Sequence, residues 1–127
     1  MNNPNPNPNP LIPMTEQSID FIYAFNNISE RAHATAKEKG WWDNPRNDGE
    51  IIALMHSELS EALEGLRHGN PPSDHIPKFS AVEEEYADVI IRIMDHARAR
   101  GFRVAEATID KIAFNASRPR KHGGKKF

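Results

Sequence analysis

The chain has 127 residues, a formal net charge of −2 and no cysteine. This length predicts a single main domain, and the lack of cysteine excludes disulfides and thiolate metal sites. The charge balance gives no general attraction to nucleic acid or membrane, no apolar run is long enough to span a bilayer, and the N-terminal residues lack the features of a secretory signal. We therefore expect a soluble cytoplasmic protein that has neither a membrane nor a nucleic-acid partner.

Residues 1–13 read MNNPNPNPNPLIP and predict an extended Asn/Pro arm, because alternating proline prevents both helix formation and strand pairing. A helical domain is expected at residues 14–118, followed by a basic Gly/Lys tail at 119–127. Apolar residues recur there at helical spacing, and the predicted helices cover about residues 16–39, 49–68, 80–101 and 104–116. Since no stretch alternates like a strand, we expect an all-α fold resembling a four-helix bundle.

Capping residues mark several helix ends. Thr15 and Asp48 are the predicted N-caps of the first two helices. Ser80 and Glu83 form a capping box that starts the third helix, and Gly101 is predicted to end it.

Two of these helices each carry a pair of acids one turn apart. Glu58 and Glu61 lie three residues apart on the second helix, and Glu85 and Asp88 do so on the third, so each pair faces one side. The acids of the second helix lie beside its predicted apolar stripe, which comprises Ile52, Met55, Leu59, Ala62, Leu63 and Leu66. Four unpaired carboxylates in one small space require shifted pKa values or a compensating cation.

Three interpretations of the four acids differ in chemistry. The first is solvated helix faces, and for Asp88 an ordinary ion pair with Arg92, four residues on, also fits. The second is a di-iron bundle, which needs Glu-x-x-His steps and is disfavoured because Glu and Asp stand there instead. The third is a Mg²⁺ site, with Mn²⁺ as a substitute, because Mg²⁺ uses a few carboxylates together with substrate phosphates. That site predicts phosphate-ester or phosphoanhydride chemistry.

Two adjacent tryptophans occupy the loop GWWDNPRNDG at residues 40–49. One interpretation of Trp41 and Trp42 is a hydrophobic plug over the end of the core, and the other is an indole that stacks on a nucleobase. Arg46 then binds either a phosphate or a surface acid. In the basic tail, Lys125 and Lys126 are either solvated or reach phosphates.

The acid pairs and their spacing resemble a known family. Glu58-x-x-Glu61 and Glu85-x-x-Asp88, with 23 residues between them, are similar to the motif of the MazG-like all-α nucleoside triphosphate pyrophosphohydrolases. The stretches SELSEALEGLR and EEYADVIIRIMDHA resemble the two core helices of that family, and the Trp loop and the closing HGGKKF resemble those of small phage-type members. The family's Lys-x-x-x-Asn-x-x-Arg step is matched by Lys111, Asn115 and Arg118, so the resemblance covers about residues 16–118.

The resemblance implies hydrolysis of a nucleoside triphosphate between the α and β phosphates, in a homodimer or homotetramer. It implies that the metal ligands are Glu58, Glu61, Glu85 and Asp88, that Lys111, Asn115 and Arg118 bind phosphate or sugar, and that Trp41 or Trp42 faces the base. Metal ions activate water for such a reaction, and Glu61 is the predicted catalytic base.

Two other classes of protein fit part of the pattern. A non-catalytic helical module would bind a nucleotide or a partner protein without turnover. A small DNA-binding domain is suggested by the basic tail, but the negative net charge argues against it because DNA affinity depends on neutralising phosphates.

Overall fold

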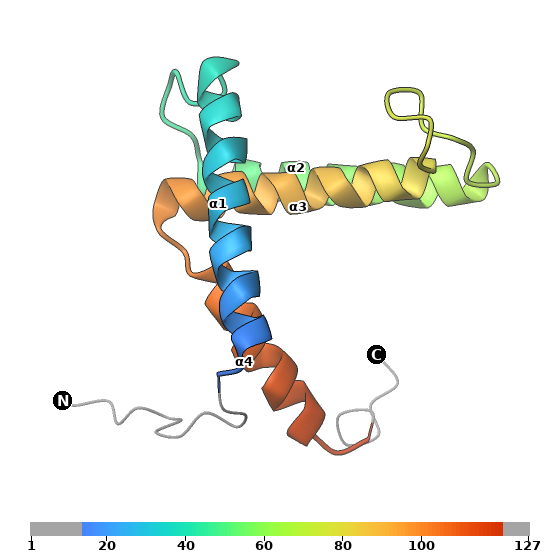
Figure 1. Cartoon of the computed structure of the whole chain (residues 1–127). Helices are drawn as coiled ribbons and strands as arrows, with labels where there is room; N and C mark the ends of the chain where they lie inside the picture. The colour runs from blue at the N-terminus through green and yellow to red at the C-terminus, as the bar shows by residue number, and fades with distance from the viewer. Residues whose placement is uncertain (1–13, 121–127) are drawn as a thin grey trace. The chain divides into compact units, whose positions relative to one another are not determined.

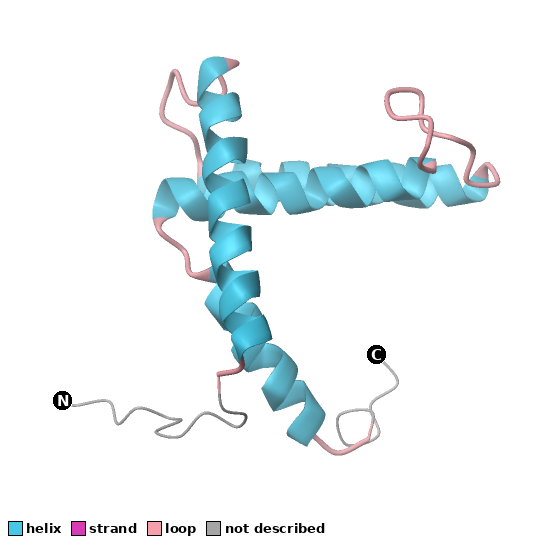
Figure 2. Cartoon of the chain, in the orientation of Figure 1, coloured by secondary structure: helices cyan, strands magenta, loops and turns pink. Residues whose placement is uncertain are grey.

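The computed structural model describes residues 14–120. Its helices are α1 (Glu16–Glu38), α2 (Asp48–Arg67), α3 (Ala81–Arg100) and α4 (Val104–Ser117) (Figure 1). No strand occurs within residues 14–120 (Figure 2), so the all-α prediction is confirmed for this part of the chain. The predicted arm at residues 1–13 and most of the predicted basic tail, at residues 121–127, lie outside the described residues.

The chain forms two compact units. One comprises Met1–Phe25 and Arg103–Phe127, and its described part contains the start of α1 and all of α4, which buries Ala105 and Ala113. The other unit, Asn26–Phe102, contains the rest of α1 together with α2 and α3. The four predicted acids and both tryptophans therefore belong to the second unit.

Local capping chemistry sets three of the helix ends as predicted. The Thr15 hydroxyl accepts a hydrogen bond from the Ser18 N–H at 3.0 Å and starts α1. Ser80 and Glu83 form the reciprocal capping box of α3. Gly101 ends α3 with a φ of 72°, a left-handed conformation that glycine adopts without a steric penalty.

The N-cap of α2 differs from the prediction by one residue. Asn47, and not Asp48, accepts a hydrogen bond from the Glu50 N–H, at 3.2 Å. The Asp48 carboxylate instead lies 3.0 Å from His96 Nε2 and accepts from Arg100 Nε at 2.8 Å. Both contacts with α3 are made by Asp48 Oδ1, so this carboxylate interacts with α3 and Asn47 caps α2 in its place.

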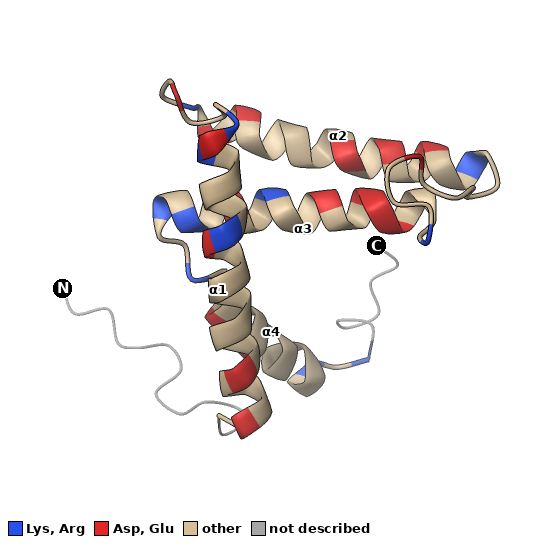
Figure 3. Ribbon diagram, turned by 45° about the horizontal axis from the view of Figure 1, so that its top comes forward, with Lys and Arg blue, Asp and Glu red and all other residues tan. Residues whose placement is uncertain are grey.

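Helices α2 and α3 lie side by side as an antiparallel hairpin (Figures 1 and 3). At the connected end, a Cβ added to Gly65 would lie only 3.1 Å from the Cβ of Ala81. The absence of a side chain at Gly65 thus permits the close approach of the two helices. The buried apolar residues of the hairpin are Ile51, Ala62, Met94 and Ala97.

The predicted apolar stripe of α2 is buried at Ala62 but not at most of its larger residues. The face that α2 buries runs through Ile51, Glu58 and Ala62, which are spaced to share one side of a helix. The larger residues of the predicted stripe are about half exposed, namely Ile52, Leu59, Leu63 and Leu66. Small residues at the contact let α3 approach the acid-bearing side, so the bulky apolar side chains flank the hairpin instead.

Candidate functional site

Three of the four predicted acids come together across the hairpin. Glu58 and Glu61 of α2 and Glu85 of α3 each offer a carboxylate oxygen, and these oxygens all lie within 4.8 Å of one another. Figure 3 shows acidic residues on neighbouring stretches of α2 and α3. The three residues differ in burial, because Glu58 is buried, Glu85 is half-buried and Glu61 is exposed. We call Glu58, Glu61 and Glu85 the glutamate cluster.

Glu85 is the most strongly perturbed member of the glutamate cluster. Burial, followed by the hydrogen bond with Glu58 and the charge of Glu61, raises the pKa of Glu85 to about 8. Its Oε2 atom is buried and has no hydrogen-bond partner. Among residues 14–120, no other buried side-chain oxygen or nitrogen lacks a partner. A buried oxygen without a hydrogen-bond partner lowers the stability of the fold, and a bound proton or cation would remove this penalty. The all-oxygen donor set fits Mg²⁺ or Mn²⁺.

The other two glutamates are shifted in opposite directions. Burial favours a higher pKa for Glu58, but hydrogen bonds with Glu85 and Arg92 outweigh it and hold the pKa below its usual value. The hydrogen bond with Glu58, and then burial, raises the pKa of Glu61. The cluster therefore contains one acid that stays ionised and two that bind protons more readily than usual.

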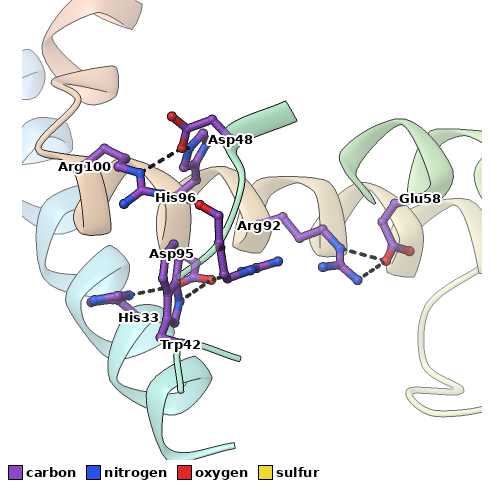
Figure 4. Close-up of polar contacts among 9 residues, drawn as sticks. His33, Trp42, Asp48, Glu58, Arg92, Asp95, His96 and Arg100 are labelled. Atoms are coloured by element: carbon purple, nitrogen blue, oxygen red, sulfur yellow. Dashed lines mark hydrogen bonds and ion pairs between the residues drawn. The ribbon is translucent and has the colours of Figure 1, made fainter. Parts of the chain in front are cut away.

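Asp88, the fourth predicted acid, is not among the three residues whose oxygens converge. It is half-buried, and burial followed by the charge of Glu58 raises its pKa. The neighbouring Arg92 forms its ion pair with Glu58 across the hairpin, with guanidinium nitrogens 2.9 Å from Glu58 Oε1 (Figure 4). The local Asp88–Arg92 pair considered from the sequence is therefore replaced by a contact between helices.

A cavity of about 570 Å³ adjoins these residues. This volume is typical of small-molecule sites. Glu58, Asp88 and Asp95 contribute acids to its wall, and Trp41 contributes an aromatic ring. Its basic lining residues are Arg31, Lys39, Arg46 and Arg92. The cavity thus combines an aromatic surface, several cations and three acids.

The two tryptophans have different environments. Trp42 is half-buried, and its indole Nε1 donates to Asp95 Oδ1 at 2.9 Å. Trp41 is 51% exposed and lines the cavity. The guanidinium carbons of Arg46 and Arg92 lie 5.4 and 5.7 Å from the centre of the Trp41 ring. Trp42 is thus tied to the protein interior, and Trp41 presents its ring to the cavity.

Asp95 is a site residue that the sequence analysis missed. It is buried on α3, and His33 Nδ1 lies 2.7 Å from its Oδ1 (Figure 4). A terminal nitrogen of Arg46 lies 3.7 Å from its Oδ2. With the Trp42 hydrogen bond, Asp95 connects α1, the Trp loop and α3. An acid inside the apolar run VIIRIMDHA was the available sequence signal, because a carboxylate in such a run needs buried partners.

The remaining predicted substrate-binding residues do not belong to the unit that contains the glutamate cluster. Lys111, Asn115 and Arg118 belong to the other compact unit. There the Lys111 ammonium lies 4.6 Å, and the Arg118 guanidinium 5.5 Å, from the centre of the Phe114 ring. Lys125 and Lys126 lie outside the described residues.

Comparison of the chain with protein-family models, with curated proteins and with solved structures gave no match. The resemblance to MazG-like enzymes therefore depends on the sequence motifs themselves. None of the helices within residues 14–120 is long and apolar enough to cross a membrane.

Proposed function

We propose that the chain is a metal-dependent nucleoside triphosphate pyrophosphohydrolase of the MazG-like type. It would cleave a nucleoside triphosphate between the α and β phosphates and release a monophosphate and pyrophosphate. The observation that carries the proposal is the buried, unpartnered Glu85 Oε2 within the glutamate cluster. This oxygen is where a hard divalent cation would relieve an unsatisfied acceptor.

The proposed metal ligands are Glu58, Glu61, Glu85 and Asp88, for Mg²⁺ or its substitute Mn²⁺. A bound divalent ion would supply neutralisation of the triphosphate charge and a lower pKa for an attacking water. Glu61 is the proposed base for the water's proton. It is the exposed member of the glutamate cluster, and its raised pKa brings it closer to the working pH, as general-base catalysis requires.

The cavity beside the acids is the proposed nucleotide site. Trp41 offers a ring face for a base, and Arg46 and Arg92 offer guanidinium groups for phosphates. By family resemblance, Lys111, Asn115 and Arg118 are proposed to bind phosphate or sugar, and Lys125 and Lys126 are proposed to reach phosphates.

The exposed apolar side chains of the hairpin support a homodimer or homotetramer. Leu59, Leu63 and Leu66 of α2 and Tyr86 and Ile90 of α3 are each between 45% and 54% exposed. Apolar surface of this kind is typical of a protein–protein interface. Light scattering after gel filtration should give a mass of at least twice 14.4 kDa, and Leu63→Glu should reduce it.

The experiment that tests the activity is pyrophosphate release from a panel of ribo- and deoxynucleoside triphosphates, with Mg²⁺ and with chelator. Metal-dependent release with an equal amount of monophosphate is expected, and Glu85→Gln should abolish it. Glu50→Gln, which changes an exposed acid in the first turn of α2, serves as the matched control. Triphosphate binding without any release from the panel would instead identify a non-catalytic nucleotide-binding module.

A further inference from the structure

Arg92 belongs to both parts of the candidate site. Its Nε and one terminal nitrogen each lie 2.9 Å from Glu58 Oε1, a carboxylate of the glutamate cluster. Its side chain is only 26% exposed, and that of Glu58 is 11% exposed. Both residues also line the cavity. Arg92 therefore lies where the acids meet the proposed nucleotide site. Figure 4 shows its guanidinium directed at Glu58.

The geometry of this pair places Arg92 in competition with a metal ion. Two of the three guanidinium nitrogens are directed at a single oxygen, Oε1, which accepts a charge-assisted hydrogen bond from Nε and forms an ion pair with a terminal nitrogen. A divalent cation on the same carboxylate would also lie beside the guanidinium charge and be repelled by it. Arg92 thus disfavours metal binding at Glu58 for as long as the pair persists.

The other surroundings of Arg92 offer its guanidinium an alternative partner. Its guanidinium carbon lies 5.7 Å from the centre of the Trp41 ring, and Arg46 lies 5.4 Å from the same ring. A nucleotide in this cavity would bring its phosphates to a wall that contains both guanidinium groups. The planar fork of arginine binds phosphate oxygens as readily as carboxylate oxygens.

We propose that Arg92 is a positioning residue that exchanges partners, holding Glu58 in the free protein and binding the triphosphate once a nucleotide enters. The exchange releases Glu58 for the metal, so that metal and nucleotide each favour the binding of the other. Such coupling is reciprocal by thermodynamic necessity. This inference depends on the proposed function, because it takes the glutamate cluster as the metal site.

The test is Mn²⁺ binding, measured by electron paramagnetic resonance or calorimetry without nucleotide, for the wild-type protein and Arg92→Met. Loss of the competing guanidinium should tighten Mn²⁺ binding to the variant by about tenfold. Arg98→Met is the matched control, since it removes the same charge from α3 and breaks an ion pair with Glu30 at 3.5 Å. Because Arg98 does not line the cavity, its variant should bind Mn²⁺ like the wild type.

The same titrations with a triphosphate whose α–β bridge is a methylene group measure the coupling. The analogue should tighten Mn²⁺ binding more in the wild type than in Arg92→Met, where only direct metal–phosphate contact remains. If Arg92→Met binds Mn²⁺ alone no more tightly than the wild type, the exchange is wrong but the proposed activity stands. If no variant binds Mn²⁺, with or without the analogue, the inference and the proposed function both fail.

A measurement on the wild-type protein covers the case in which Arg92→Met does not fold. The Arg92 Nε–H resonance, assigned by its loss in Arg92→Lys, reports the partner of the guanidinium. We expect it to move when Mg²⁺ and the analogue are added together. An unchanged resonance in the saturated protein would show that Arg92 keeps Glu58, and would overturn the exchange.

Discussion

The indole of Trp42 donates a hydrogen bond to the buried Asp95 carboxylate at 2.9 Å, which ties the Trp loop to α3. The same carboxylate contacts His33 at 2.7 Å and Arg46 at 3.7 Å. Three groups from two other segments therefore depend on one acceptor. Arg46 is held by this network at the cavity wall, so Asp95 also affects the proposed nucleotide site.

Asp95→Ala should lower the free energy of unfolding by about 2 kcal/mol, because a buried acceptor is removed and its donors lose their partner. Urea denaturation followed by circular dichroism would measure the change. Asp110→Ala on α4 removes an exposed acid and should have little effect. Equal stability of the two variants would contradict the role of Asp95 in holding the loop.

The two tryptophans should respond differently to substitution. Trp41→Ala should weaken binding of a nonhydrolysable triphosphate by about tenfold, since loss of base stacking costs roughly 1–3 kcal/mol, with little change in stability. Trp42→Phe should instead lower stability by about 1 kcal/mol through loss of its hydrogen bond to Asp95. Calorimetric titration and urea denaturation of both variants would separate the effects. The reverse pattern would show that Trp42 is the ligand-facing ring.

Helix positions were predictable from the sequence because the signals are local. The Ser80–Glu83 capping box and Gly101 act within one turn of the helix that they bound, and both behave as predicted. Asp48 was a plausible cap, but its contacts with His96 and Arg100 come from a helix about fifty residues away. Contacts of that kind are absent from any local pattern.

The candidate site was predictable only in part for the same reason. Helical spacing brought Glu58 and Glu61 to one face, and the hairpin then placed Glu85 beside them. From the sequence, Asp88 was one possible partner of Arg92, whereas the partner is Glu58 on the other helix. The buried face of α2 was also missed, because its position depends on the close approach that Gly65 permits.

Glu85 should make the metal-free protein less stable as the pH rises. Its pKa of about 8 in the folded protein exceeds the ordinary value of 4.5, so the folded state holds a proton that the unfolded state has lost. The contribution of Glu85 to stability is complete below about pH 4.5 and is lost progressively up to about pH 8. Thermal unfolding with chelator should show this decline in the wild type, and a flatter profile in Glu85→Gln.

Adding metal to the same thermal unfolding measurements tests whether Glu85 binds a cation. At pH 8, Mg²⁺ should raise the unfolding temperature of the wild type, because a ligand that binds only the folded state stabilises it. Glu85→Gln should gain less, and Glu50→Gln should behave like the wild type. An unchanged pH profile in Glu85→Gln would mean that another group causes the decline.

A histidine in the loop between α2 and α3 forms a pair with a glutamate of α3 that also responds to pH. His75 Nδ1 lies 2.6 Å from Glu84 Oε1, and the buried Ser73 hydroxyl donates to Glu84 Oε2. The hydrogen bond with Glu84 raises the pKa of His75, and hydrogen bonds with Ser73 and His75 lower the pKa of Glu84. The stabilisation from Glu84 is lost as the pH falls from the ordinary pKa of a glutamate, 4.5, through the lowered pKa of Glu84. The stabilisation from His75 is lost as the pH rises through the raised pKa of His75.

Glu84→Gln should therefore return the pKa of His75 toward its ordinary value of 6.5. A nuclear magnetic resonance titration of the His75 ring protons would measure this. Glu83→Gln is the matched control, because it removes the neighbouring acid, which belongs to the capping box of α3, whereas His75 contacts Glu84. If both variants shift the His75 titration equally, general charge and not the Glu84 contact sets its pKa.

Glu61 should be needed for turnover more than for folding. It is exposed, so Glu61→Gln should leave the circular dichroism spectrum unchanged. If Glu61 takes the proton of the attacking water, the variant should lose about 10²–10⁴-fold in Mg²⁺-dependent pyrophosphate release. Triphosphate affinity should change much less, because the cavity wall is left intact. Near wild-type release by Glu61→Gln would remove its role as the base and leave Asp88, which also has a raised pKa, as the next acid to substitute.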